Sequence, residues 1–278
     1  MAVKNIAPPP YLAGLVRNIW FTDFKMPNDH YQSIRILANG SPGLIFQHAE
    51  GHSAVKGAGG NLLPLAFIYG QSTVPCVNQM IKDAIVCGFE FYPSALKNIF
   101  GIDAAILTDA LVELEHLLSK EIIDQLINCP NIYEVIQLLC VTLAKQSASF
   151  PFSTFVEESI LLITQSAPQL SPAALPQYFH ISQRQFQRKF KERIGVCPET
   201  YIRITKFQQS IHWLQNKKFK KIGDISYALG YTDQAYFNRE FKFFSGYTPK
   251  EFMKVLAKQQ LFYRTPEHTV IPLRILTD

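Results

Sequence analysis

The stretch SQRQFQRKFKERIGVCP at residues 182–198 recurs, in altered form, as DQAYFNREFKFFSGYTP at residues 233–249. The offset is 51 residues, and the identical pairs are Gln183/Gln234, Phe186/Phe237, Arg188/Arg239, Phe190/Phe241, Lys191/Lys242, Gly195/Gly246 and Pro198/Pro249. Repetition at a fixed interval indicates a supersecondary unit that occurs twice. The C-terminal half of the chain is therefore expected to contain two related modules.

Each copy predicts one amphipathic helix. Ser182 and Asp233 are suited to cap the helix start, two phenylalanines four residues apart share one helical face, and a glycine can end the helix. The phenylalanines are expected to lie in the core. The positions between them are polar or cationic, and Arg, Gln and Asn are the side chains that bind guanine and adenine edges in the major groove. Both helices are thus candidates for contact with DNA bases.

The flanking segments complete two helix-turn-helix patterns. A short helix from Ser171-Pro172 to about His180 precedes the first copy, and residues 222–229 form its counterpart before the second copy. Residues 198–215 hold apolar side chains three and four positions apart, which predicts a connecting helix about 27 Å long. That length suits two helices set at adjacent major-groove faces, roughly 34 Å apart.

Charge divides the chain in two. Residues 1–170 hold nine Lys and Arg against fourteen Asp and Glu, a net charge of −5, whereas residues 171–278 hold eighteen against eight, a net charge of +10. Only the C-terminal half is therefore expected to approach a polyanion such as nucleic acid.

The 278 residues, 47% of them hydrophobic, suffice for two domains of ordinary size. The first ten residues lack the apolar core of a secretory signal, and no apolar run approaches the roughly 18 residues of a membrane span. We therefore expect a cytoplasmic protein that does not contact membranes. The five cysteines are odd in number and widely spaced, which favours packing residues or free thiols over disulfides or a zinc site.

The N-terminal half begins with short strands. Residues 33–38, 43–47, 66–69 and 84–92 are apolar or alternating segments separated by turn residues, which predicts a small β-barrel or sandwich. From residue 93 the apolar spacing becomes helical, including residues 107–118 and 122–127, and Pro130-Asn131 starts a further helix. Serines and Pro151 mark residues 146–153 as a linker, and residues 154–166 predict the next helix.

The motifs at residues 182–190, 230–231 and 237–249 resemble the DNA-binding domain of the AraC/XylS family of bacterial transcription regulators, and the likeness covers about residues 155–257. Residues 8–120 resemble, more weakly, the effector-binding domain of one branch of that family. The resemblance implies an α+β protein of two domains: a cupin-like β-barrel over about residues 8–92 with helices over 93–145, and an all-α domain with two helix-turn-helix modules joined by a long helix. The expected boundaries are an effector-binding and dimerisation domain at 1–148, a DNA-binding domain at 153–258 and a tail at 259–278.

Carried over by position, the resemblance also implies a DNA interface. Base contacts would come from Arg184, Gln187, Arg188, Gln234, Asn238 and Arg239, and backbone contacts from Ser182, Gln183, Lys191, Lys218, Lys221 and Lys242. The first module departs from the family pattern at Leu175 and Pro176, and an interior proline predicts a kinked or looser helix there. The implied partners are double-stranded promoter DNA, RNA polymerase, a small-molecule effector and a second copy of the chain.

Candidates for other chemistry are few. Arg17, Trp20, Arg35, Tyr69 and Phe91 could line an effector pocket, although most are expected to fill the barrel. His48, Glu50 and His52 lack further ligands at suitable spacing, so no metal site is predicted, and no cofactor or catalytic motif is evident. We therefore expect a regulator rather than an enzyme. Two alternatives stay open: a constitutive architectural DNA-binding protein, and a regulator that repairs DNA through a reactive cysteine.

Overall fold

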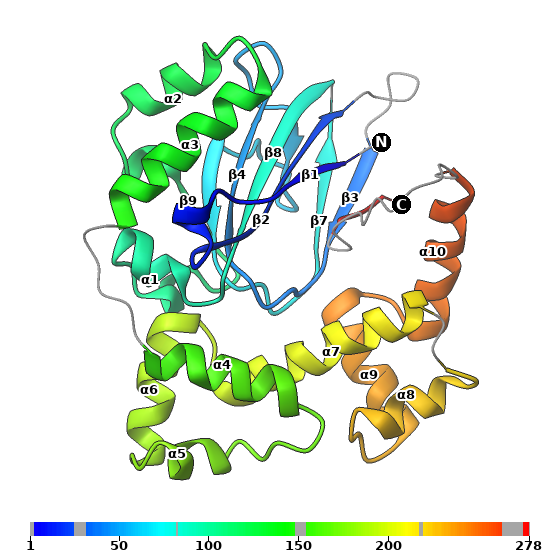
Figure 1. Cartoon of the computed structure of the whole chain (residues 1–278). Helices are drawn as coiled ribbons and strands as arrows, with labels where there is room; N and C mark the ends of the chain where they lie inside the picture. Colours follow the sequence, from blue (N-terminus) through cyan, green and yellow to red (C-terminus); the bar gives the residue numbers. More distant parts are fainter. Residues whose placement is uncertain are drawn as a thin grey trace.

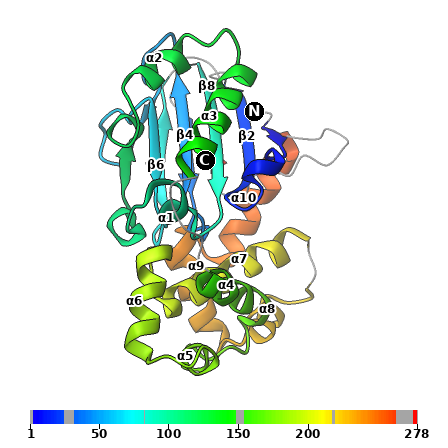
Figure 2. The same ribbon diagram turned by 60° about the vertical axis from the view of Figure 1, so that its left-hand side comes forward.

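The computed structural model describes residues 3–24, 32–81, 83–147, 154–216, 219–262 and 275–277. Strands and a few helices form the N-terminal part, and helices alone form the part from residue 154 to 262 (Figure 1). Viewed from a second side, the strand-rich part lies above the helical part (Figure 2). The predicted α+β organisation in two parts is confirmed. Within the described residues, no helix has the length and apolar character needed to span a membrane.

The strands form two antiparallel sheets. The larger has the order β1 (Lys4–Ile6), β2 (Val16–Phe24), β8 (Ala84–Phe91), β4 (Gly43–His48), β6 (Ala66–Tyr69), β9 (Leu111–Glu113). The smaller has the order β10 (Ile275–Thr277), β3 (Gln32–Ile36), β7 (Cys76–Met80), β5 (Val55–Lys56). The sheets are not closed into the barrel that the resemblance implied, because no described strand pairs one sheet with the other.

Strand β8 shows how the larger sheet is buried on both faces. Cys87, Phe89 and Phe91 belong to a core shared with the helices of the N-terminal part, whereas Ala84 and Val86 belong to a second core with Ile34 and Met80 of the smaller sheet. Successive side chains of a strand point to opposite faces. The continuous apolar run of this strand therefore reflects burial on two sides.

Six helical segments within the described residues cover the outer face of the larger sheet. They are η1 (Pro10–Leu12), α1 (Ala95–Phe100), η2 (Ala104–Leu107), η3 (Leu114–His116), α2 (Glu121–Ile127) and α3 (Ile132–Ser147). Asn131 caps α3 through hydrogen bonds from the backbone of Tyr133 and Glu134, 3.0 and 3.1 Å, as its position predicted. The predicted helical stretch 107–118 is wrong. Asp109 has a positive φ of 55° and breaks the helix, and β9 then pairs with β6.

The helical part consists of α4 (Thr154–Ser166), α5 (Ala174–Tyr178), α6 (Gln183–Ile194), α7 (Pro198–Asn216), α8 (Ile222–Ala228), α9 (Gln234–Ser245) and α10 (Pro249–Phe262). We call α4–α6 the first module, α8–α10 the second module, and α6 and α9 the repeat helices. The expected linker falls largely on residues 148–153, outside the described part, as does most of the expected tail. Helix α10 continues past the expected domain end at 258.

Helix α7 joins the two modules by contributing to both cores. Tyr201 and Ile202 pack with the first module, whereas Ile204, Phe207 and Ile211 pack with the second. Nineteen residues make a helix about 28 Å long, close to the predicted length. Because one continuous helix serves both cores, the modules are held in a defined relation to each other.

Candidate nucleic-acid interface

The repeat helices start at the caps that the sequence predicted. Ser182 Oγ accepts a hydrogen bond from the Gln185 backbone at 3.3 Å, and Gln185 Oε1 accepts one from the Ser182 backbone at 3.4 Å. In the second module Asp233 Oδ1 accepts from the Tyr236 backbone at 2.7 Å. Such caps satisfy donors that a helix start leaves unpaired. Both helices are therefore anchored at their first turn.

The turns before the repeat helices have the same backbone pattern at an offset of 50 residues. Phe179, His180 and Ile181 donate backbone hydrogen bonds to the carbonyls of residues 175, 177 and 176, and residues 229, 230 and 231 donate to residues 225, 227 and 226. The offset returns to 51 at the caps because Thr232 is an additional residue in the second turn. The turn carries positive φ angles at His180 (52°) and Gly230 (65°).

Pro176 does not kink the first module in the way that we expected. Helix α5 is only five residues long and Pro176 is its third residue. A backbone nitrogen in the first turn of a helix has no intrahelical acceptor, so a proline there removes no hydrogen bond. Pro176 is buried, and its carbonyl accepts the turn hydrogen bond from Ile181 at 3.1 Å.

The aromatic faces of the repeat helices are core, as predicted. Phe186, Phe190, Phe237 and Phe241 are each at most 1% exposed. The ring centroids of Phe186 and Phe190 lie 5.8 Å apart, and those of Phe237 and Phe241 lie 5.9 Å apart. This burial fixes which face of each helix remains available to a partner.

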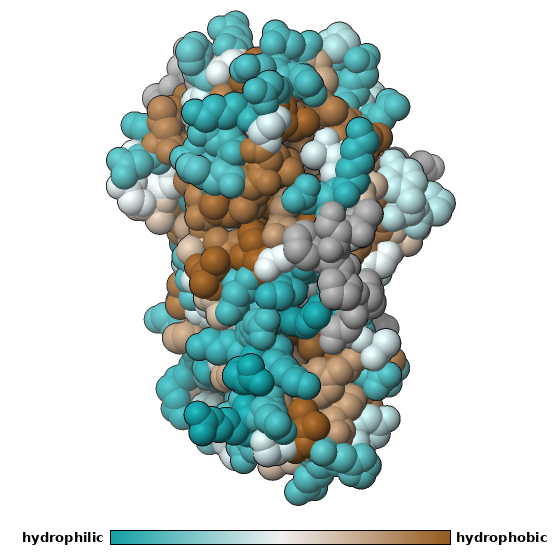
Figure 3. Space-filling view, turned by 90° about the vertical axis from the view of Figure 1, so that its left-hand side faces the viewer, coloured by the Kyte–Doolittle hydropathy of each residue, from teal (hydrophilic) through white to brown (hydrophobic). Residues whose placement is uncertain are grey.

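In the first module, Arg184 and Arg188 lie on the exposed face of α6, four residues apart. Among the described residues neither forms an ion pair, whereas Gln187 is half-buried and donates a hydrogen bond to Glu199 at 3.3 Å. The surface over α4–α6 is largely hydrophilic, in contrast to the apolar area above it (Figure 3). Two of the three residues expected to contact bases are thus unobstructed within this chain.

In the second module, Gln234 and Arg239 are exposed on α9, and the Arg239 guanidinium lies 5.7 Å from the centre of the Tyr236 ring. Asn238 differs from them. It is half-buried, and its Oδ1 is inaccessible to solvent without a hydrogen-bond partner among the described residues. A buried unpaired carbonyl oxygen is unfavourable, so Asn238 would have to change rotamer to present its amide to a base.

The residues expected to contact the DNA backbone are distributed around both modules. Gln183, Lys191, Lys221 and Lys242 are exposed, whereas Lys218 lies outside the described residues. The Ser182 hydroxyl is already engaged in the helix cap. Asp224 accepts hydrogen bonds from the backbone of Lys220 and Lys221 at 2.9 and 2.7 Å, and these bonds lower its carboxyl pKa. The start of α8 is thus fixed beside two exposed lysines.

The second repeat helix is oriented by an ion pair that the sequence patterns did not predict. Arg203 of α7 makes two hydrogen bonds to the carboxylate of Glu240 of α9, at 2.7 and 2.9 Å, and Glu240 is only 7% exposed. The Arg203 guanidinium also lies 5.3 Å from the centre of the Phe244 ring. In the sequence, the pair is indicated only by Glu240, an acidic residue in a basic module at the position where the first module has Lys189.

The N-terminal part contacts the first module through polar side chains of α1 and of Ser94, the residue before it. Ser94 Oγ donates to Glu157 of α4 at 2.5 Å, Lys97 pairs with Glu192 at 2.9 Å, and Arg193 donates to Asn98 Oδ1 at 2.9 Å. Nearby, Thr108 donates to the carbonyl of Gly195, the residue that ends α6, at 2.7 Å. The end of the first repeat helix is therefore held against the N-terminal part.

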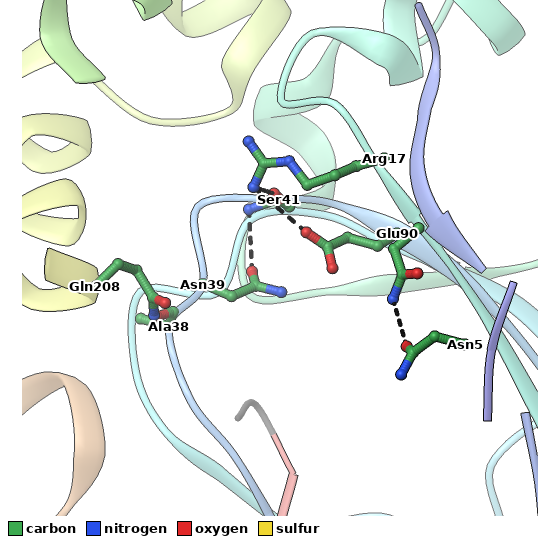
Figure 4. A network of polar contacts seen from close by, with 8 residues as sticks. Asn5, Arg17, Ala38, Asn39, Ser41, Glu90 and Gln208 are labelled. Atoms are coloured by element: carbon green, nitrogen blue, oxygen red, sulfur yellow. Dashed lines mark hydrogen bonds and ion pairs between the residues drawn. The ribbon is translucent and has the colours of Figure 1, made fainter. Parts of the chain in front are cut away.

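A loop after β3 contacts the second module and α7. Leu37 and Ala38 belong to the core of that module, and Gln208 of α7 donates to the Ala38 carbonyl. Figure 4 shows how the loop is held from the other side: Arg17 donates to Ser41 Oγ at 3.5 Å and to Glu90 at 3.4 Å, and Asn39 Oδ1 accepts from the Ser41 backbone at 3.0 Å. The loop thus joins the larger sheet to α7 through a few contacts.

The residues expected in an effector pocket do not converge. Trp20 lies in the core between the sheets and Phe91 lies in the core beneath the helices. Arg17 pairs with Glu90, whereas Arg35 donates to the Tyr247 hydroxyl of the second module at 3.0 Å. Tyr69 of β6 is half-buried opposite Gly43 of β4. Arg17 and Arg35 thus serve contacts at or near the boundary between the two parts.

Burial disfavours the reactive thiolate form of four of the five cysteines. Burial raises the pKa of Cys87 to about 12 and that of Cys140 to about 11, and it also raises the pKa values of Cys76 and Cys129. Reactive cysteines have lowered pKa values.

His48 Nδ1 accepts a backbone hydrogen bond from Gly51 at 3.3 Å, and the described residues hold no cluster of three metal-ligating side chains.

Two family models match separate parts of the chain. Residues 4–113 match a domain family of unknown function, DUF6597, and residues 175–254 match a helix-turn-helix domain family. A stretch of 78 residues is 36% identical to the F1 operon positive regulatory protein of Yersinia pestis, covering 28% of this chain and 26% of that protein. The match thus spans about a quarter of the length of this curated relative.

The comparison with solved structures includes the following two proteins. ToxT of Vibrio cholerae is 13% identical with a TM-score of 0.47, over 91% of this chain and 98% of ToxT. A transcriptional regulator of Chromobacterium violaceum, described as having an AraC-type DNA-binding domain, is 25% identical with a TM-score of 0.35, over 37% of this chain and 93% of that one.

Proposed function

Since the chain belongs to the AraC/XylS family of transcription regulators, we propose that it binds promoter DNA by placing α6 and α9 in the major groove. The observation that carries this proposal is the duplicated arginine. Arg188 and Arg239 occupy the same position in both repeats, and both are exposed opposite a buried phenylalanine face. A capped helix with its apolar face buried can present such side chains to base edges without rearrangement.

The contacts divide into two kinds. Arg184, Arg188, Gln234 and Arg239 are the side chains placed to contact bases, with Gln187 and Asn238 joining them after a rotamer change. Gln183, Lys191, Lys221 and Lys242 would contact phosphates, together with Lys218. Phosphate contacts position a protein on DNA and make its affinity fall with salt, whereas base contacts select the sequence.

The N-terminal part would receive the signal. It touches the first module at Gly195 and the second module at its core, so a ligand that prefers one arrangement of these contacts would change the affinity for DNA. We expect a small-molecule or protein signal, with RNA polymerase and a second copy of the chain as further partners in the cytoplasm.

Selection of binding sites from a random double-stranded DNA pool at fixed salt tests the proposal. The full-length protein should enrich a motif with two blocks about 10 base pairs apart, one for each repeat helix. A motif with one block would mean that one module contributes no base contacts. Absence of any motif despite salt-sensitive binding would replace the proposal with the constitutive architectural protein.

A further inference from the structure

The C-terminal strand returns to the N-terminal part of the molecule. Helix α10 ends at Phe262, yet β10 pairs antiparallel with β3, with Ile275 opposite Ile36, Leu276 opposite Arg35 and Thr277 opposite Ile34. It forms the edge of the smaller sheet, on the side of β3 away from β7 (Figure 1). The helical part is therefore connected to the N-terminal part at both of its ends.

Strand β3 also holds the second module. The Arg35 guanidinium lies 4.6 Å from the centre of the Tyr247 ring, and its Nε donates to the Tyr247 hydroxyl at 3.0 Å. Tyr247 follows Gly246, the residue that ends α9. Two residues beyond β3, the Ala38 backbone donates to the Phe244 carbonyl at 3.5 Å. Arg35, which lies opposite β10, thus contacts the segment that directly follows α9.

The chemistry of this edge suits an extended peptide. An uncovered edge strand presents unpaired backbone donors and acceptors, and an added strand satisfies them by main-chain hydrogen bonds. Three residue pairs are few for a free peptide. The tail, however, is joined to α10 by the twelve residues 263–274, which can span at most about 40 Å, and such a tether gives a high effective concentration.

We propose that β10 is a strap that keeps the second module against the N-terminal part by completing the edge of β3 beside Arg35. With the strap paired, β3 has a strand on each side and holds Arg35 toward Tyr247. With the strap released, β3 becomes an edge strand and its contact with the end of α9 weakens. Any effect of strap release on DNA binding rests on the proposed function, whereas the pairing of β10 with β3 does not.

Hydrogen exchange of the full-length protein without DNA tests the strap. The variant carrying Ile275→Pro and Leu276→Pro removes two successive backbone donors, which point to opposite sides of a strand, so one of them faces β3. The matched control carries Ile275→Val and Leu276→Val, which preserve strand propensity. The proline variant should exchange at least about fivefold faster at residues 34–36 and 244–248, and the valine variant should match the parent.

Three outcomes would overturn the proposal. Unchanged exchange at residues 34–36 would show that β10 does not pair there in solution. Faster exchange at 34–36 with no change at 244–248 would show pairing that does not hold the module. Protection that rises with protein concentration, together with dimers in sedimentation, would show that the strand is exchanged between two copies. As further support, Tyr247→Phe alone should make hydrogen exchange at residues 244–248 faster. In that background, the two proline changes should increase the exchange rate at these residues by a smaller factor than they do in the parent.

Discussion

His180 adopts a left-handed backbone conformation, φ 52°, at the position where the second module has Gly230 at 65°. This conformation costs an L-residue roughly 1–2 kcal/mol and costs glycine almost nothing. Because the His180 side chain is exposed, His180→Gly should raise the free energy of unfolding of the first module by about 1 kcal/mol, measured by urea denaturation. His180→Ala keeps the Cβ and is the matched control. Equal stability of the two variants would show that the turn is not strained.

Arg188 and Arg239 should determine base preference. Replacing either with alanine should weaken binding to the selected site by about 1–3 kcal/mol and relax the preference at one base pair, because a bidentate contact with a base is lost. Titration of labelled duplexes with single-base changes measures both effects. Lys189→Ala is the control in the first module, since Lys189 is exposed on another side of α6 and lies 5.8 Å from the centre of the Phe155 ring. An Arg188→Ala protein with unchanged specificity would contradict the assigned helix face.

The exposure of some side chains on the repeat helices could be predicted from the sequence, whereas that of others could not. Arg184, Arg188 and Arg239 are exposed as the repeat predicted, because helical spacing puts them opposite the phenylalanines. Gln187 and Asn238 stand at the border of that face, where neighbours decide burial. Glu199, four positions after Gly195, forms the hydrogen bond with Gln187, and no spacing rule within one helix predicts such a contact.

At the scale of elements, the Arg203–Glu240 pair fixes α9 against α7. Glu240→Ala would remove two hydrogen bonds to a charged group and leave Arg203 beside an apolar surface. Hydrogen bonds of this kind contribute about 1.5–3 kcal/mol, and Arg203 is partly exposed, so we expect a loss of about 2 kcal/mol. Thermal unfolding measures it. Glu251→Ala, which removes the exposed cap of α10 at Thr248, should cost about 1 kcal/mol; a larger loss there than at Glu240 would contradict the assignment.

Elements with strong local signals were predicted well. Residues 154–166 form α4 as expected, and α7 extends the expected helix by one residue, because their apolar spacing is regular and no breaker interrupts it. The helix predicted over residues 107–118 is not formed, although leucines recur there at helical intervals. Their backbone instead forms a strand with β6 between two short turns of helix, and pairing with a distant strand outweighs local periodicity.

At the scale of the whole molecule, the contact of α1 with the first module is polar and should be separable. Ser94→Ala with Asn98→Ala removes the hydrogen bonds to Glu157 and Arg193. Each contributes about 1 kcal/mol, so the equilibrium for undocking should shift by roughly 30-fold, with faster hydrogen exchange in α4 and at the end of α6. Asn131→Ala, which removes the cap of α3 in the same part, is the control. Equal exchange at α6 in both variants would show that these bonds do not hold the module.

The two modules, their caps, their buried phenylalanines and the basic half that carries them could all be predicted from the sequence. These depend on residues within about 50 positions and on spacing along a helix, which a chain shows directly. Other features become visible only in the folded chain: Gly195 and Tyr247 both contact the N-terminal part, no described strand joins the two sheets, and β10 pairs with β3. These contacts join segments distant in the chain. Strand pairs and docking surfaces form where strand edges and polar groups from distant segments come together and satisfy each other's hydrogen bonds. A local sequence pattern does not specify which distant segment that will be.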